Sequence, residues 1–245
     1  MAVVLEAGTP RTYLEAVQYI CQMSGVNPPD TLDSPDRNTI RAMLAVKQAL
    51  NTVWYKHARW PWRWRWSIIE MLADQMWYEL PAAFNNAGCT VGVHKTVGSL
   101  TYKPYEWLVE QCPFIRSLPP EFGDEDTEAE VIDANYSGVP NYWTIQGGYL
   151  GLWYPPSQDF IDATAVKLIV GHYTNLIDPV AGSDELGLPM DILPAHENIA
   201  LGIFGRYREW PDWKVTMEIG YSQLNDAMAR ARRAGWESSQ LMPED

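Results

Sequence analysis

Carboxylate side chains crowd into one short stretch of the chain, EFGDEDTEAE at residues 121–130. Two carboxylates can hydrolyse a glycosidic bond when an apolar pocket raises the pKa of one of them and a defined distance separates the pair. The acids here are close neighbours around a glycine, which is typical of a solvated segment whose charges repel one another. We therefore expect a loop and no active site at these candidate residues, which are Glu121, Asp124, Glu125, Asp126 and Glu128.

The other reactive residue types form no recognisable catalytic or metal-binding pattern. The sequence has no GxSxG, GxGxxG or P-loop motif, and its four histidines show neither HxxxH nor HExxH spacing. His172 and His196 are isolated and are expected to be structural. Cys21, Cys89 and Cys112 are odd in number and far apart, so we expect reduced thiols and neither a zinc site nor a disulfide framework. The sequence therefore predicts no enzyme, no metal and no cofactor.

The second unusual stretch is RWPWRWRW at residues 59–66, which contains four of the chain's 12 tryptophans. Successive side chains of a strand point to opposite faces, so this even-odd alternation predicts a strand with an indole face and a guanidinium face. We expect the indoles to pack on the preceding helix and the arginines to face water or a neighbouring subunit. The residues of this core joint or subunit interface are Trp60, Trp62, Arg63, Trp64, Arg65 and Trp66.

Composition narrows the classes of partner. The 245 residues are 47% hydrophobic and 20% charged, which is typical of a folded chain. Their net charge of −13 disfavours stable binding to the phosphate backbone of a nucleic acid. No window approaches the ~18 apolar residues that a membrane helix needs, and the N-terminus lacks the pattern of a signal peptide. We expect no membrane partner.

The spacing of apolar residues predicts helices at both ends of the chain, over 12–24, 38–58, 196–210 and 212–235. Ser34 is expected to cap the second helix with Pro35 at its first position. Asp212 is expected to cap the last helix and Gly235 to end it. The second helix should bury one apolar stripe, consisting of Ile40, Met43, Leu44, Leu50, Val53, Trp54 and His57.

Between these helices the patterns are mostly those of β-strands. Residues 60–72 and 76–84 are expected to be strands. NYWTI and YLGLWY should form a hairpin that turns at Gln146-Gly147-Gly148, with TAVKLIVGHYT as a further strand beside it. YEWLVEQC is expected to be a short helix.

These elements predict an α+β fold in which N- and C-terminal helices form a helical bundle and a central antiparallel β module forms a small sandwich or barrel. The expected divisions are the N-terminal helices at 1–60, the β module with the acidic insert at 61–185, and the C-terminal helices at 186–235, which return to the bundle. A C-terminal tail is expected at 236–245.

The order of these segments resembles that of one known family. A long helix runs into the Trp/Arg stretch (ALNTVWYKHARWPWRWRW), and a strand then ends in Leu-Pro-x-x-Phe (ADQMWYELPAAF). SGVPNYWTIQGGYLGLWYPP, VKLIVGHYT and SDELGLPMDILPAHENIALGIFGRY follow. Over residues 35–210 this pattern resembles the head-to-tail adaptor proteins of tailed bacteriophages, the connector or tail-tubular proteins. The middle region, 85–135, is larger than in the shortest members of that family.

The resemblance implies a structural protein of the virion that is assembled in the host cytoplasm. Such adaptors form a homo-oligomeric ring, a dodecamer, beneath the portal protein, and they extend the DNA channel. A distal tail or nozzle protein binds below, with tail fibres as a further candidate partner. Subunits are expected to stay soluble until they meet the portal.

The same resemblance assigns roles to two segments. Double-stranded DNA would pass through the ring without sequence-specific binding, which an acidic lumen favours, so the acidic segment becomes a contact or channel loop. The tail would contact the portal through Trp236, Gln240, Leu241 and Met242. The alternatives are a head-completion ring, a tail-terminator ring, and a tail-associated cell-wall hydrolase.

Overall fold

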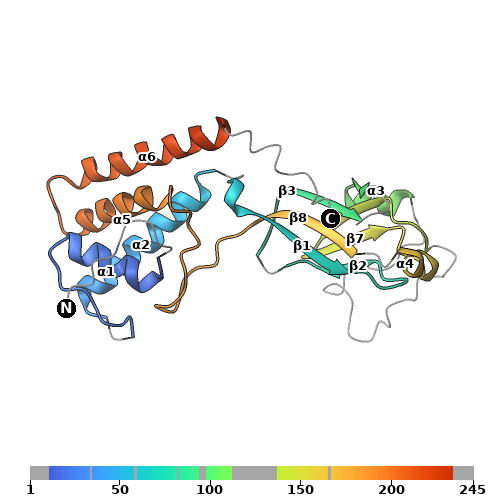
Figure 1. Cartoon of the computed structure of the whole chain (residues 1–245), viewed down its shortest axis with the longest axis horizontal. Helices are drawn as coiled ribbons and strands as arrows, with labels where there is room; N and C mark the ends of the chain where they lie inside the picture. The colour runs from blue at the N-terminus through green and yellow to red at the C-terminus, as the bar shows by residue number, and fades with distance from the viewer. Residues whose placement is uncertain are drawn as a thin grey trace. The chain divides into compact units, whose positions relative to one another are not determined.

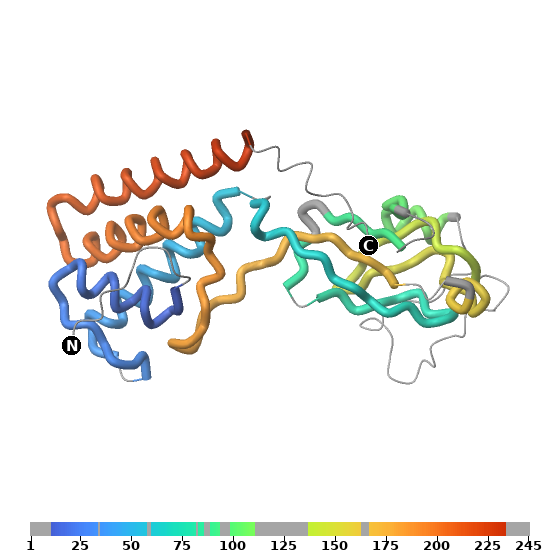
Figure 2. Tube along the Cα trace, in the orientation of Figure 1, coloured from blue at the N-terminus to red at the C-terminus, as the bar shows by residue number. Residues whose placement is uncertain are grey.

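The computed structural model describes residues 11–33, 35–57, 60–81, 83–93, 98–111, 137–164 and 167–233, and the chain forms two compact units. The first, here called the helical unit, takes its described residues from the chain up to Trp62 and from Leu176 onward. The second, the β unit, is Arg63–Asn175. Helices from both ends of the sequence contact one another in the helical unit (Figures 1 and 2), so the β unit is an insertion. The chain returns to the helical unit at Leu176 and not at residue 186.

Within the described residues the helical unit contains α1 (Tyr13–Met23), α2 (Arg37–Tyr55), α5 (Leu193–Tyr207) and α6 (Trp213–Arg233). A capping box starts α1, because the Thr12 hydroxyl accepts from the Glu15 N–H at 3.3 Å and the Glu15 carboxylate accepts from the Thr12 N–H at 2.9 Å. Asp36 caps α2 by accepting a hydrogen bond from the Thr39 N–H. The expected cap at Ser34 is therefore wrong, since the helix begins at Arg37.

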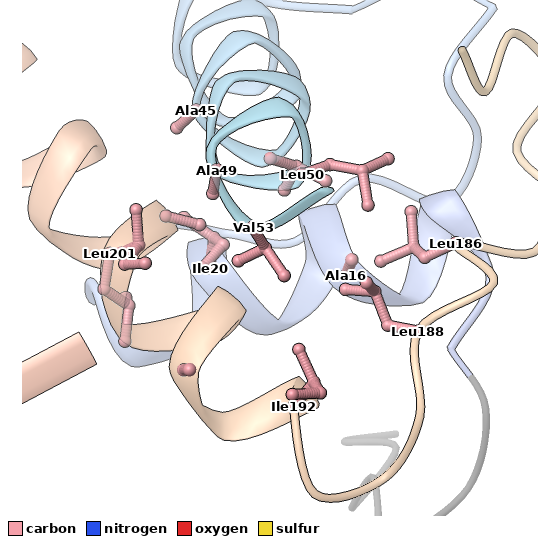
Figure 3. Close-up of a cluster of buried hydrophobic side chains, with 14 of the residues drawn as sticks. Ala16, Ile20, Ala45, Ala49, Leu50, Val53, Leu186, Leu188, Ile192 and Leu201 are labelled. Atoms are coloured by element: carbon pink, nitrogen blue, oxygen red, sulfur yellow. The ribbon is translucent and has the colours of Figure 1, made fainter. Parts of the chain in front are cut away.

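The core of the helical unit is built on the small residues of α2. Ala45, Ala49, Leu50 and Val53 face a cluster that also contains side chains of α1, α5 and the segment before α5 (Figure 3). The predicted stripe is right for Leu50, Val53 and Trp54, but Ile40 and Leu44 are exposed. Alanines take their place in the core because a short side chain lets neighbouring helices approach closely.

α5 and α6 pack against each other through glycines. A Cβ atom on Gly220 would lie 2.8 Å from the Ile199 backbone nitrogen, and one on Gly202 would lie 2.9 Å from the Met217 nitrogen. Real Cβ atoms do not approach so closely, so these glycines let the two backbones meet. α6 depends on this contact, because its buried residues are only Gly220, Leu224 and Ala227.

The β unit contains two four-stranded sheets in its described residues, with the strand orders β1-β8-β3-β4 and β2-β7-β6-β5. The pairs are antiparallel except for β5 with β6, which is parallel. The α+β class expected from the sequence is thereby confirmed. The strands are β1 (Trp64–Glu70), β2 (Trp77–Glu79), β3 (Phe84–Val93), β4 (Gly98–Ser99), β5 (Thr101–Tyr102), β6 (Tyr142–Gln146), β7 (Tyr149–Trp153) and β8 (Lys167–Thr174).

The two sheets share one buried core, to which β3 and β8 contribute from one sheet and β2, β6 and β7 from the other. The hairpin of β6 and β7 is confirmed, with Gly147 and Gly148 at positive φ in its turn. β8 is also confirmed as a strand, but it pairs with β1 and β3 and not with the hairpin. The short helices are α3 (Tyr105–Gln111), as predicted, and α4 (Gln158–Thr164).

Candidate functional site

The Trp/Arg segment does not form one continuous strand. Residues Pro61–Arg63 form a 3-10 turn, η1, and β1 begins only at Trp64. Proline fixes φ and has no N–H to donate to a ladder, so the alternation up to Arg63 does not extend the sheet. The predicted strand is therefore wrong for its first half, and the segment divides between the two units.

Trp60 and Trp62 pack on α2, as the sequence predicts for the indoles. The Trp60 N–H donates a hydrogen bond of 3.0 Å to the Val53 carbonyl, and the indole is 2% exposed. The last carbonyls of a helix have no partner within it, so this indole both fills the core and caps the end of α2. Trp62 lies edge-on to Trp54, with 4.7 Å between ring centroids.

Arg63 does not face water, contrary to the prediction. Its side chain is 1% exposed, and Nε and Nη2 both donate to the Thr174 carbonyl, at 3.0 and 2.8 Å. The Thr174 hydroxyl donates in return to the Arg63 carbonyl at 3.3 Å. The guanidinium fork thus ties the start of β1 to the end of β8. Arg65 is exposed, as predicted.

Trp64 and Trp66 lie on the outer face of the first sheet and hold β1 against β8. They pair in register with Tyr173 and Gly171, and the Trp64 ring is 4.9 Å from the Tyr173 ring. A Cβ atom on Gly171 would lie 2.5 Å from Trp64 and 2.6 Å from Trp66, so only glycine leaves room for both indoles. The next residue on this face, Ile68, is mostly exposed. The expectation that the whole indole face is buried is therefore wrong at this position.

A serine and a histidine form a pair that sequence reasoning missed. Ser67 of β1 and His172 of β8 are hydrogen-bonded, with 3.0 Å between Oγ and Nε2. Nδ1 lies 3.1 Å from the Tyr173 carbonyl; a carbonyl only accepts, so Nδ1 carries the proton and Nε2 accepts from the serine. No local sequence pattern marks this pair, because it depends on the register in which β1 pairs with β8.

This geometry resembles a nucleophile with its base, but the partner of Nδ1 is a backbone carbonyl and not a carboxylate. His172 is buried, and the Phe84 ring lies 5.1 Å from its ring. Burial lowers the pKa of His172, which keeps the ring neutral. We interpret the pair as structural, because each of the two polar groups supplies the hydrogen-bond partner that the other needs inside the β unit.

A second polar group lies inside the helical unit. Arg11 forms an ion pair with Glu197 at 2.8 Å, and its guanidinium lies 4.2 Å from the centroid of the Tyr19 ring. Burial raises the pKa of Glu197 although Arg11 opposes the shift. Beside it, His196 Nε2 lies 3.2 Å from the Val46 carbonyl, and burial lowers the pKa of His196 to about 4. These contacts tie α5 to the N-terminal segment through Arg11 and to α2 through Val46. The sequence carried no signal for the ion pair.

The remaining predicted residues lie outside the part of the chain that the structure describes. These are the acidic residues Glu121, Asp124, Glu125, Asp126 and Glu128, and the tail residues Trp236, Gln240, Leu241 and Met242. In the described part, no group of three or more His, Cys, Asp and Glu residues could hold a metal ion. No described helix has the length and apolar character needed to cross a bilayer.

Comparison with models of known protein families and with curated proteins gives no match to this chain. The polar clusters described above hold the fold together, and the described residues also include large apolar side chains that are exposed. Several project from regular helices and strands, namely Ile40, Leu44, Ile68, Tyr102, Val215 and Ile219.

Proposed function

We propose that this chain is a head-to-tail adaptor of a tailed bacteriophage, a structural virion protein that forms a ring beneath the portal and extends the DNA channel. In this proposal the terminal helices form the bundle of each subunit. The β unit is the inserted module to which the distal tail or nozzle protein binds. The observation that carries the proposal is the exposure of large apolar side chains from ordered elements in both units. A ring subunit needs several adhesive faces, and exposed apolar groups are typical of them.

Charge and architecture add support. The net charge of −13 suits a channel past which DNA slides, because an acidic wall repels the phosphate backbone. The helical unit takes its residues from both ends of the chain, and the β unit is inserted between them in the sequence, as the family resemblance implies.

The experiment is to mix the purified chain with the portal protein of the same particle and to image the products by electron microscopy. We expect a closed ring on the portal and the chain among the proteins of purified virions by mass spectrometry. A chain lacking residues 236–245 should form no complex, whereas a control with Glu125→Gln and Glu128→Gln should dock normally. Absence of the chain from virions would overturn the proposal.

Two further measurements separate the alternatives. The axial position of the ring in the particle distinguishes an adaptor from a head-completion or tail-terminator protein. Zymography on peptidoglycan tests for a wall hydrolase. Clearing by the wild-type chain that is lost in the Glu125→Gln or Glu128→Gln variant would favour the hydrolase over the adaptor.

A further inference from the structure

α2 presents an exposed stripe that is apolar and basic. Ile40 and Leu44, one helical turn apart, are 45% and 48% exposed. Arg37 and Arg41 lie on the same side of the helix, and no acidic residue occurs within Arg37–Tyr55. We call these four residues the α2 face. Large aliphatic side chains at this exposure remain in water in the isolated chain, although burying them is favourable.

α6 presents a second stripe, which is apolar and acidic. Val215 and Ile219, also one turn apart, are 55% and 48% exposed. Glu218 and Asp226 are exposed beside them. The basic residues of α6 lie towards its two ends, at Lys214, Arg230, Arg232 and Arg233. We call Val215, Glu218, Ile219 and Asp226 the α6 face. Its buried side is the one that packs on α5 through Gly220.

The two faces belong to different sides of one packed unit. α5 contacts both α2 and α6, and Figure 1 shows α6 along one side of α5 with α1 and α2 along the other. None of the four charged residues on the faces forms an ion pair with another described residue. Among the described residues these charges are thus left for a second molecule.

The charges decide which faces match. Two α2 faces brought together would oppose arginines to arginines, and two α6 faces would oppose carboxylates to carboxylates. An α2 face against an α6 face instead pairs opposite charges around two apolar pairs. Because the matching faces are different and lie on different sides of the unit, each copy can bind one neighbour on each side, which generates a closed ring or an open helix.

We propose that the α2 face of one copy packs against the α6 face of the next copy. This inference rests on the proposed ring and specifies its lateral contact. The partner is a second copy of this chain, and the contact is centred on Leu44 and Ile219 with Arg41 and Glu218 at its rim.

The first experiment traps the contact with cysteines. In a background with Cys89→Ser and Cys112→Ser, with Cys21 retained because it is fully buried, Leu44→Cys and Ile219→Cys are introduced in separate chains. A short bismaleimide should link an equimolar mixture into dimers of one Leu44→Cys chain and one Ile219→Cys chain. Each variant alone should give none. Dimers from a single variant would show a two-fold contact and overturn the proposal.

The second experiment reverses charges at the rim. Arg41→Glu and Glu218→Arg should each lower the yield of this cross-link, which reports a weak contact between mostly monomeric chains, roughly tenfold. The pair carrying both changes should recover the yield, because the opposite charges are exchanged. Asp30→Arg and Lys167→Glu, which reverse exposed charges off these two helices, serve as matched controls and should have no effect. Single variants that cross-link like the unchanged pair, or a doubly changed pair without recovery, would contradict the pairing.

The outcomes also separate this inference from the proposed function. A ring that forms on the portal but gives no link between positions 44 and 219 would leave the adaptor role standing and refute the contact. A link between these positions in a chain that never docks on a portal would leave the contact standing and refute the adaptor role.

Discussion

Two tryptophans four residues apart are expected to respond oppositely to the same substitution. Trp60 and Trp64 both bury their indole nitrogen, but only Trp60 has a partner among the described residues, the Val53 carbonyl. Trp60→Phe keeps most of the apolar contact and removes the hydrogen bond, leaving a carbonyl at the end of α2 without its donor. Trp64→Phe removes a buried N–H that has no partner in the described structure.

The magnitudes follow from these contacts. Loss of a buried hydrogen bond with one partner left unsatisfied costs about 1–3 kcal/mol, so Trp60→Phe should lower the free energy of unfolding of the helical unit by about that amount. Trp64→Phe should be neutral or slightly stabilising for the β unit, because an unpaired polar group is no longer desolvated. Truncation of each side chain to alanine should also change the free energy of unfolding by different amounts. Trp60→Ala should cost about 3–5 kcal/mol, and Trp64→Ala should cost less because its indole is only partly buried.

The assay is urea denaturation followed by far-UV circular dichroism, since fluorescence would change with the tryptophans themselves. All four variants are compared with the wild type at one pH, and the slope against urea reports whether the two units unfold together. Equal costs for Trp60→Phe and Trp64→Phe, or a larger cost for Trp64→Phe, would refute the assignment of Trp60 as the cap of α2.

Three further predictions use the same measurement. Burial lowers the pKa of His196 from 6.5 to about 4. Between these two pH values the unfolded chain binds a proton that the folded chain does not. The free energy of unfolding therefore has its full value above pH 6.5 and falls by roughly 3 kcal/mol as the pH decreases to 4. His196→Asn should remove that slope, and an unchanged slope would contradict the prediction. Gly220→Ala should cost about 1–3 kcal/mol by separating α5 from α6, whereas the exposed Ser222→Ala should cost nothing; equal effects would refute the close packing. Arg63→Met should cost roughly 2 kcal/mol through its lost bonds to the Thr174 carbonyl, and a neutral result would show that the fork is dispensable.

The sequence predicted the elements of this fold better than their inward faces. Strong periodicity placed the four long helices and the β6–β7 hairpin, whose Gly147-Gly148 turn has a local signal. On α2, however, Ile40 and Leu44 were predicted to lie in the core, and both are exposed. Apolar residues occur on more than one face of this helix, and the choice between the faces depends on which neighbour packs there, a tertiary fact that periodicity does not contain.

The prediction of one continuous strand in the Trp/Arg segment was wrong for a different reason. Alternation from Trp60 to Trp66 is the same whether the chain is one strand or a turn followed by a strand. The turn at Pro61–Arg63 changes the environment of each residue before β1. Arg63 is buried because its guanidinium donates to the Thr174 carbonyl at the end of β8. That strand lies far from Arg63 in the sequence. Local patterns cannot report such partners, which also explains why the Ser67–His172 pair was missed.

The exposed aliphatic side chains of the α2 and α6 faces also set the strength expected of the ring contact. Covering a half-exposed Ile, Leu or Val stabilises by about 1 kcal/mol, so the four aliphatic side chains of the α2 and α6 faces together supply about 4 kcal/mol. Association costs about 4–15 kcal/mol in lost rotational and translational freedom, so this contact alone leaves the chain largely monomeric. A ring then requires a template that holds neighbouring copies together, as docking on a portal does. Sedimentation of the free chain should show monomers, and stable rings without a portal would refute this estimate.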